Sequence, residues 1–283
     1  MAGVSMKDIK LRIRSMESTK QITRAMEMVA ASKLRRAQDR VLQSRPYFEV
    51  LYQAVTEIGM SNREFSSPYV RSREGDALYI VIAGDRGLAG GYNHNILKLA
   101  EAEMAGARAV VLPIGKKALE HFRARGSAVL TGAYAEAAGL SISDCFTMAR
   151  SVCRGFLDGQ FGAVHLAYTN FASILVQTPC VLPLLPLRAP EPPEEPKAPG
   201  QLTLYEPSSE AVFDTMIPEY LGGLIYGALC ESVASELGAR RTAMDAATKN
   251  AEEMIGDLSL KYNRARQGAI TQEITEIVAG ADA

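Results

Sequence analysis

One short segment has the composition of a ligand-binding turn. GDRGLAGGYN, residues 84–93, follows an apolar run and precedes a helical pattern. Glycine-rich turns of this kind bind phosphate groups when they open a helix. However, Gly84, Gly87, Gly90 and Gly91 do not have the G-x-G-x-x-G spacing, and the segment lacks the Gly-Lys-Ser/Thr of a P-loop. The pattern favours a structural turn, and an anion or partner contact is the alternative.

The other chemically active residue types form no recognisable site. The three histidines, His94, His121 and His165, are too scattered for metal-ligand spacing, and no nucleophile elbow is present. Carboxylate pairs such as Glu252–Glu253 fall on the solvated face of a predicted helix. The cysteines form no C-x-x-C pair and sit among apolar residues, which predicts buried thiols in a reducing compartment; they are Cys145, Cys153, Cys180 and Cys230. We therefore expect no independent active site, no metal and no cofactor.

The first part of the chain is predicted to be one long helix. No glycine or proline interrupts residues 4–45, and Pro46 is expected to bend the helix rather than end it, so that it reaches about residue 60. An apolar seam recurs at helical spacing, with a register slip near residues 18–21. Its members are Ile9, Ile13 and Met16, then Ile22, Met26 and Val29, then Leu34, Ala37 and Val41.

The last part of the chain is predicted to be a second long helix. Pro218 suits a position near its start, and no proline follows. The chain stays apolar almost to its last residue, where soluble helices usually become polar. Either the N-terminal helix covers this end, or the end enters an apolar site on another protein. The predicted seam consists of Ile217, Leu221 and Leu224, then Ile255, Leu258 and Tyr262, then Ile270, Ile274 and Ile277.

These two helices are complementary in charge. Residues 1–45 carry eleven Lys or Arg against four acids, a net charge of +7, whereas residues 214–283 carry eleven acids against six bases, a net charge of −5. Exposed ion pairs contribute only ~0–1 kcal/mol each, but they select orientation and partner. Because each seam also needs an apolar partner, we predict that the two ends form an antiparallel intramolecular coiled coil.

Between the helices, strands alternate with helices, which predicts a mainly parallel sheet. The fold class is thus an α/β (Rossmann-like) domain inserted into a long two-helix coiled coil. The predicted strands are 77–84, 107–115, 127–132, 163–171 and 174–187. The predicted domains are the N-terminal helix 1–62, the α/β domain 75–187, a Pro/Glu-rich linker 188–204 and the C-terminal helix 210–283.

Composition excludes some classes and leaves two alternatives open. The net charge of the whole chain is −1, which does not favour binding to the negatively charged backbone of a nucleic acid. No apolar run reaches the ~18 residues that a membrane span needs. No signal or transit peptide is evident, which predicts a protein kept on the cytoplasmic side. The basic N-terminal helix leaves a coiled-coil nucleic-acid binder as one alternative, and the glycine-rich turn leaves a nucleotide-binding enzyme as the other.

The chain resembles a known family along its whole length. MKDIKLRIRSMESTKQITRAMEMVAASKLRRAQDR near the start, RRTAMDAATKNAEEMIGDLSLKYNRARQGAITQEITEIVAGA near the end and GDRGLAGGYN between them are similar to the gamma subunits of bacterial F-type ATP synthases. The resemblance implies a rotor stalk with no catalysis of its own. Its coiled coil turns inside a ring of three alpha and three beta subunits, and its foot contacts the epsilon subunit and the membrane c-ring.

The resemblance also implies which residues contact partners. The expected coupling contacts are Met26, Arg35, Arg36, Asp85, Arg86, Arg241, Gln267, Thr271 and Glu273. Arg35, Arg36 and Arg241 are expected to meet acidic loops of the beta subunits. Met26 could equally be an ordinary seam residue, and Thr271 and Glu273 could be ordinary solvated helix positions. The resemblance implies no nucleic acid and no membrane contact except through the c-ring, at the cytoplasmic face of the bacterial membrane.

Overall fold

A computed structural model describes residues 5–60, 66–187 and 205–281. Two helices, α1 (Met6–Met60) and α5 (Ser209–Ala281), enclose the remaining elements in sequence. These are β1 (Asp76–Ile82), α2 (Tyr92–Met104), β2 (Ala109–Ile114), α3 (Lys116–Ala124), β3 (Ala128–Val129), a 3-10 turn η1 (Ala137–Gly139), α4 (Ile142–Leu157), β4 (Phe161–Phe171) and β5 (Gln177–Leu185). The described strands and helices follow the predicted order. The predicted linker 188–204 lies outside the described residues.

The two long helices tolerate internal prolines. Helix α1 continues through Pro46, as predicted. The expectation for Pro218 was wrong, because α5 begins at Ser209 and Pro218 lies inside it. A proline inside a helix costs ~3 kcal/mol. On either side of it, Phe213, Ile217 and Leu221 are almost completely buried in one apolar cluster, and their burial offsets that cost.

The chain divides into two compact units. The coiled-coil unit consists of Met1–Ser32 and Arg240–Ala283, and the sheet unit consists of Lys33–Ala239. Each unit thus contains a segment of both long helices, so residues far apart in the sequence pack together in each of them.

The sheet unit contains five strands in the order β3-β2-β1-β4-β5. Strands β3, β2, β1 and β4 are parallel, and β5 pairs antiparallel with β4, which confirms a mainly parallel sheet. Strand β1, DALYIVI, is buried over its last five residues because helices cover both faces of the sheet.

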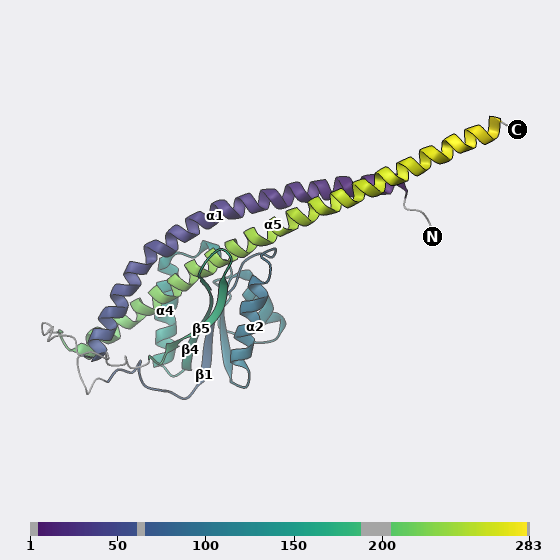
Figure 1. Cartoon of the computed structure of the whole chain (residues 1–283). Helices are drawn as coiled ribbons and strands as arrows, with labels where there is room; N and C mark the ends of the chain where they lie inside the picture. Colours follow the sequence, from purple (N-terminus) through teal and green to yellow (C-terminus); the bar gives the residue numbers. More distant parts are fainter. Residues whose placement is uncertain (1–4, 61–65, 188–204, 282–283) are drawn as a thin grey trace. The chain divides into compact units, whose positions relative to one another are not determined.

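Two apolar layers flank this sheet. Figure 1 shows α4 and α2 on opposite sides of it. On one face, α4 and the sheet-unit part of α5 pack over Leu78, Ile80 and Ile82 of β1. On the other face, α2 and α3 pack over Tyr79 and Val81. Alternate side chains of one strand thus enter different cores, as the period of a strand requires.

The seam of the coiled-coil unit differs in part from its prediction. Ile9 is buried, but Ile22 and Val29 are 57% and 55% exposed, whereas Thr23 and Ala30 are buried. The Oγ1 atoms of Thr23 and Thr248 lie 2.7 Å apart across the two helices. Small side chains at the contact let two helices approach closely, so the helix turns Thr23 and Ala30 inward and leaves the larger Ile22 and Val29 outside.

The cysteines offer a test of the packing. All are free thiols, and burial raises the pKa of Cys145 and of Cys153 to about 12, while Cys180 is only half-buried. Only about one in ten thousand of the buried thiols is then ionised at pH 8, and the thiolate is the reactive form. We expect Cys145 and Cys153 to react with iodoacetamide at pH 8 only after unfolding in urea, as followed by mass spectrometry. Rapid labelling of either in the native chain would contradict this packing.

Candidate functional site

The glycine-rich segment is tied down by its own side chains. The carboxylate of Asp85 accepts hydrogen bonds from the backbone N–H groups of Ala137 (2.9 Å), Ala138 (3.2 Å) and Lys116 (3.4 Å). The side chain of Asn93 accepts a bond from Gly84 N (2.8 Å) and donates one to the carbonyl of Arg86 (3.1 Å). These contacts link the turn after β1 to the elements beside it and support a structural role.

Asp85 and Arg86 give a matched test of this role. Asp85→Ala is expected to reduce the free energy of unfolding by about 2 kcal/mol, because it leaves backbone N–H groups without their acceptor. Arg86→Ala removes an exposed side chain and is expected to change the free energy of unfolding by less than about 0.5 kcal/mol. Urea denaturation followed by circular dichroism measures both. Equal stability of the two variants would show that Asp85 does not hold the turn.

Helix α5 fills one edge of the sheet. In other doubly wound proteins, this is the edge that binds ligands. Such ligands lie beyond the carboxyl ends of the strands where the order reverses, here between β1 and β4. At this edge, Ser232 of α5 accepts a hydrogen bond from Thr169 N, and Ser235 donates one to Thr169 O, each at 3.2 Å. A Cβ atom on Gly84 would lie 2.8 Å from the carboxyl carbon of Glu236. Side chains of the same chain therefore occupy this crevice.

Two cavities in the described part of the chain are small. One of about 110 Å³ lies beside the filled crevice and is lined by Tyr92, Asn95, Thr169 and neighbouring residues. Another of about 190 Å³ lies between α1, α4 and α5. Drug-sized ligands and cofactors occupy ~300–1,000 Å³. Both volumes are too small for a nucleotide, which counts against the nucleotide-binding alternative.

The residues of the coiled-coil unit set an antiparallel register. Lys20 Nζ lies 2.8 Å from Glu252 Oε1, and Arg241 Nε lies 3.7 Å from Glu27 Oε1. The two hydrogen-bonded threonines lie between these pairs in sequence. Met26 is half-buried beside this contact, so at least part of its side chain belongs to the seam. The sequence did not predict Glu27 as the partner of Arg241, because Glu27 is one of the few acids on the basic N-terminal helix. The pairing is visible only in the tertiary structure.

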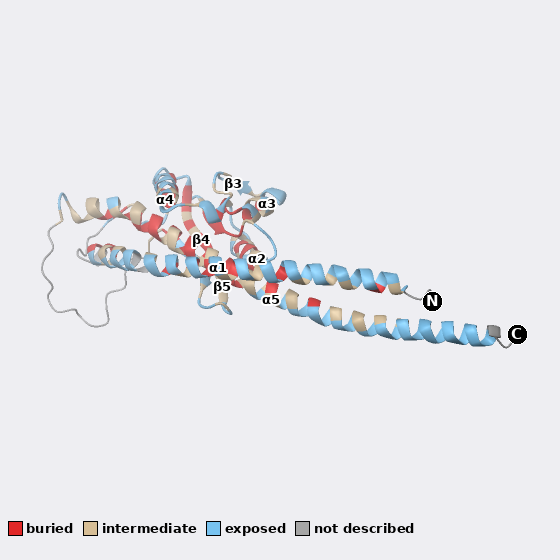
Figure 2. Cartoon of the chain, turned by 90° about the horizontal axis from the view of Figure 1, so that it is seen from above, coloured by how far each residue is buried: buried red, intermediate tan, exposed pale blue. Residues whose placement is uncertain are grey.

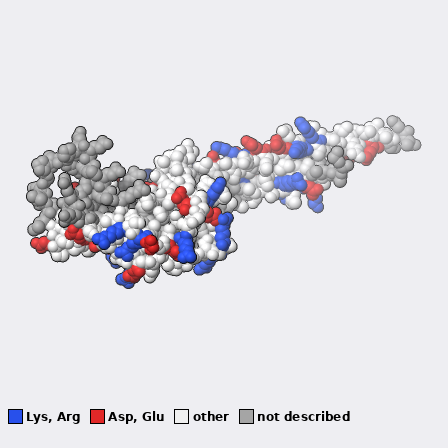
Figure 3. All heavy atoms as spheres, turned by 90° about the horizontal axis from the view of Figure 1, so that it is seen from below, with Lys and Arg blue, Asp and Glu red and all other residues white. Residues whose placement is uncertain are grey.

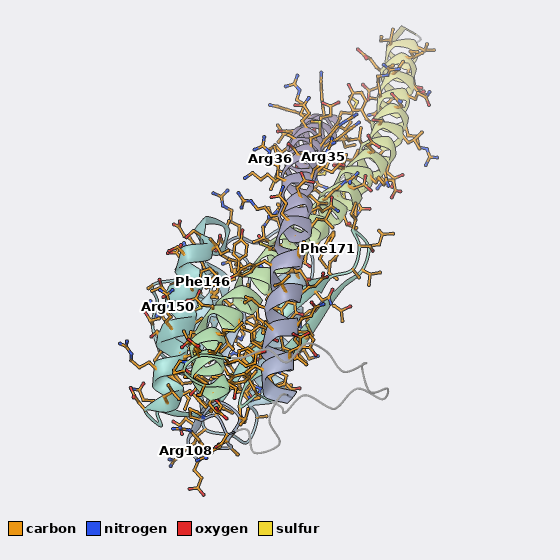
Figure 4. All side chains as sticks on the ribbon, turned by 90° about the vertical axis from the view of Figure 1, so that its left-hand side faces the viewer. Arg35, Arg36, Arg108, Phe146, Arg150 and Phe171 are labelled. Carbon is orange, nitrogen blue, oxygen red and sulfur yellow. The ribbon has the colours of Figure 1, made fainter. Side chains whose placement is uncertain are left out.

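Arg35 and Arg36 lie on the exposed part of α1. Their neighbours Leu34 and Ala37 are buried against α5, so the helical period turns both arginines outward (Figure 4). Within the described residues, neither guanidinium has an ion-pair partner. Asp39 is exposed one turn further along α1, but no ion pair joins it to either arginine in the described residues, so both cations are available to an external acidic partner.

The C-terminal end of α5 extends past its partner helix. Helices α1 and α5 run in opposite directions, so the pairing of Lys20 with Glu252 places Met6 opposite about residue 266. Residues 266–279 are all exposed (Figure 2), including Gln267, Thr271 and Glu273. The described part of α1 therefore does not cover this end. The prediction that Ile270, Ile274 and Ile277 close the seam was wrong, because they are 47%, 56% and 66% exposed.

Positive and negative charges mix on one face of the molecule. On the face shown in Figure 3, Lys and Arg atoms are interspersed with Asp and Glu atoms. Among the described helices, no segment combines the length and the apolar character that crossing a bilayer requires.

The comparisons with known proteins agree with this architecture. The family model described as ATP synthase matches residues 5–283. The ATP synthase gamma chain of Ruminococcus albus is 48% identical over 282 residues, which cover 96% of each chain. This chain belongs to the ATP synthase gamma chain family. The gamma chain of Lachnoclostridium phytofermentans is 42% identical over 99% of both chains. A sodium-ion-specific gamma chain of Acetobacterium woodii is 41% identical, with 99% of this chain and 98% of that one covered.

Solved structures share the fold of this chain. A chain of the Euglena gracilis mitochondrial ATP synthase, from a complex that includes F1 and the c-ring, matches with a TM-score of 0.66 at 18% identity. The match covers 98% of this chain and 94% of that one. A chain from the rotor of the same enzyme matches with a TM-score of 0.61 at 16% identity, over 94% and 98% of the two chains. Two long helices around an inserted sheet are thus a fold that this chain shares with chains of solved ATP synthase complexes.

Proposed function

We propose that this chain is the central rotor stalk of an F-type ATP synthase. It couples ion flow through the c-ring to ATP synthesis in a ring of alpha and beta subunits. The observation that supports this most directly is the coiled-coil unit, where both ends of the chain pair and α5 continues past α1 as an exposed helix. The stalk has no active site of its own, and catalysis belongs to the beta subunits.

The pairing explains how such a stalk acts on its partners. A coiled coil of two unequal helices presents different side chains in each direction, so each beta subunit meets a different face as the stalk turns. Only contacts that differ between two states can shift the equilibrium between them. We assign such contacts to Arg35, Arg36 and Arg241, and to Gln267, Thr271 and Glu273 on the part of α5 beyond the overlap.

The proposed location follows from the partners. The sheet unit would lie near the epsilon subunit and the c-ring, and the stalk would be peripheral, on the cytoplasmic face of a bacterial membrane. Its contact with the membrane would pass through the c-ring alone.

Co-purification tests this function. Affinity-tagged chain isolated from its own cells, in mild detergent, is expected to bring down stoichiometric alpha and beta subunits together with ATPase activity. The same chain purified alone is expected to have none. Recovery without alpha and beta subunits would contradict the proposal, as would steeply salt-dependent binding to DNA or RNA by the isolated chain.

A further inference from the structure

The hairpin between β4 and β5 exposes two large apolar side chains at its tip. Leu175 is 83% exposed and Val176 is 53% exposed, whereas most apolar residues of the sheet unit are buried. Single exposed apolar residues are common on protein surfaces. Two adjacent ones at the end of a hairpin form a small projecting surface, and binding residues are often found on such loops when a rigid scaffold supports them.

The backbone of this tip is held in one conformation. Ser173 N donates to the carbonyl of Val176 at 3.0 Å, and the hydroxyl of Ser173 accepts from Leu175 N (3.3 Å) and Val176 N (3.1 Å). The amide of Gln177 donates to the carbonyls of Ser173 (3.1 Å) and Ile174. A loop ordered in advance loses less entropy when a partner binds to it.

The tip is also braced against both long helices within the sheet unit. Phe171 and Ile174 pack on a cluster formed by Leu34 and Ala37 of α1 with Leu237 and other residues of α5. A Cβ atom on Gly238 would lie 3.3 Å from Gln177 Nε2 and 3.6 Å from Phe171 Cε2, so the hairpin touches α5 closely. The hairpin is therefore fixed to the part of α1 that carries the exposed arginines.

We propose that Leu175 and Val176 form a second contact of the rotor with the ring of alpha and beta subunits, beside the contacts of Arg35 and Arg36. This inference rests on the proposed function. The nearby charges indicate the kind of partner. Residues 171–177 carry no charge, whereas the adjoining stretch of α1, residues 33–40, exposes four bases, Lys33, Arg35, Arg36 and Arg40, against one acid, Asp39. The complementary partner is a loop of the ring that carries acidic and apolar side chains together. As the stalk turns, the tip meets this loop at some angles only.

Photo-cross-linking in the assembled complex tests the contact. A benzophenone amino acid at position 175 is expected to cross-link to an alpha or beta subunit on illumination. The same amino acid at Leu130 is the control, because Leu130 is also exposed but follows β3, at the opposite edge of the sheet. Position 130 is expected not to cross-link to the ring.

The outcomes separate this inference from the function on which it rests. If the chain co-purifies with the ring but position 175 cross-links to nothing, or only to other subunits, the hairpin contact is wrong and the rotor function stands. If the chain does not co-purify with the ring, both are wrong.

A functional variant supplies a second measurement. Leu175→Ser combined with Val176→Ser alters only exposed side chains, so assembly is expected to be unchanged. ATP synthesis in inverted membrane vesicles is expected to fall about threefold or more, because an apolar anchor of an interface is lost. Leu130→Ser is expected to leave it unchanged. Unchanged synthesis in the double variant would overturn the contact.

Discussion

Reversing two charges on α1, by Arg35→Glu with Arg36→Glu, is expected to lower ATP synthesis about tenfold or more while the complex still assembles. Both guanidinium groups are exposed and have no ion-pair partner among the described residues, so the chain itself does not need them. Close charge pairs across an interface reach coupling energies of ~1.5 kcal/mol or more, and ~1.4 kcal/mol is a tenfold change in equilibrium. Reversal would replace the proposed attraction to an acidic loop by repulsion.

The measurement is ATP synthesis by inverted membrane vesicles under a fixed ion gradient, with the gamma chain quantified in each preparation. Lys98→Glu is the matched control, because Lys98 is an exposed cation of α2 in the same unit and is not among the expected contacts. Arg241 is left unchanged, since reversing it would also set a carboxylate against Glu27. Wild-type synthesis by the double variant would show that these arginines do not couple the stalk to the ring.

Replacing Gly222 is expected to have the largest effect on stability. Gly222 lies inside α5, and a Cβ atom there would lie 2.2 Å from Cδ1 of Phe146 on α4. Phe146 also contacts the ring of Tyr47 on α1, with the ring centres 6.4 Å apart. The helices therefore approach each other at this glycine. We expect Gly222→Val to lower the free energy of unfolding by about 3 kcal/mol, because a crowded contact must open to admit the side chain.

Gly256 is the matched control within the same helix. It lies in the coiled-coil unit, and a Cβ atom there would meet nothing within 4 Å. Gly256→Ala is expected to stabilise the helix by up to ~1 kcal/mol, since glycine is a poor helix former. Urea denaturation followed by circular dichroism measures both variants. If Gly222→Val is as stable as the parent chain, the close approach of α4 and α5 is not real.

The sequence was sufficient for the architecture. Long runs without glycine or proline, a seam at helical spacing and opposite net charges at the two ends predicted both helices and their pairing. Alternating strand and helix patterns predicted the inserted sheet. These features depend on periodicity and composition over tens of residues, and such averages survive individual exceptions like Pro218.

The tertiary structure alone decided which residues meet. Ile22 and Thr23 are neighbours in sequence, and only the pairing of Thr23 with Thr248 determines that the threonine faces inward. Likewise, the sequence of GDRGLAGGYN is compatible with anion binding. In the folded chain, side chains of α5, more than a hundred residues away in sequence, fill the crevice beside it. Local patterns determine the period of an element because backbone geometry is local. They leave its rotation and its neighbours open, because those depend on side chains brought together only by folding.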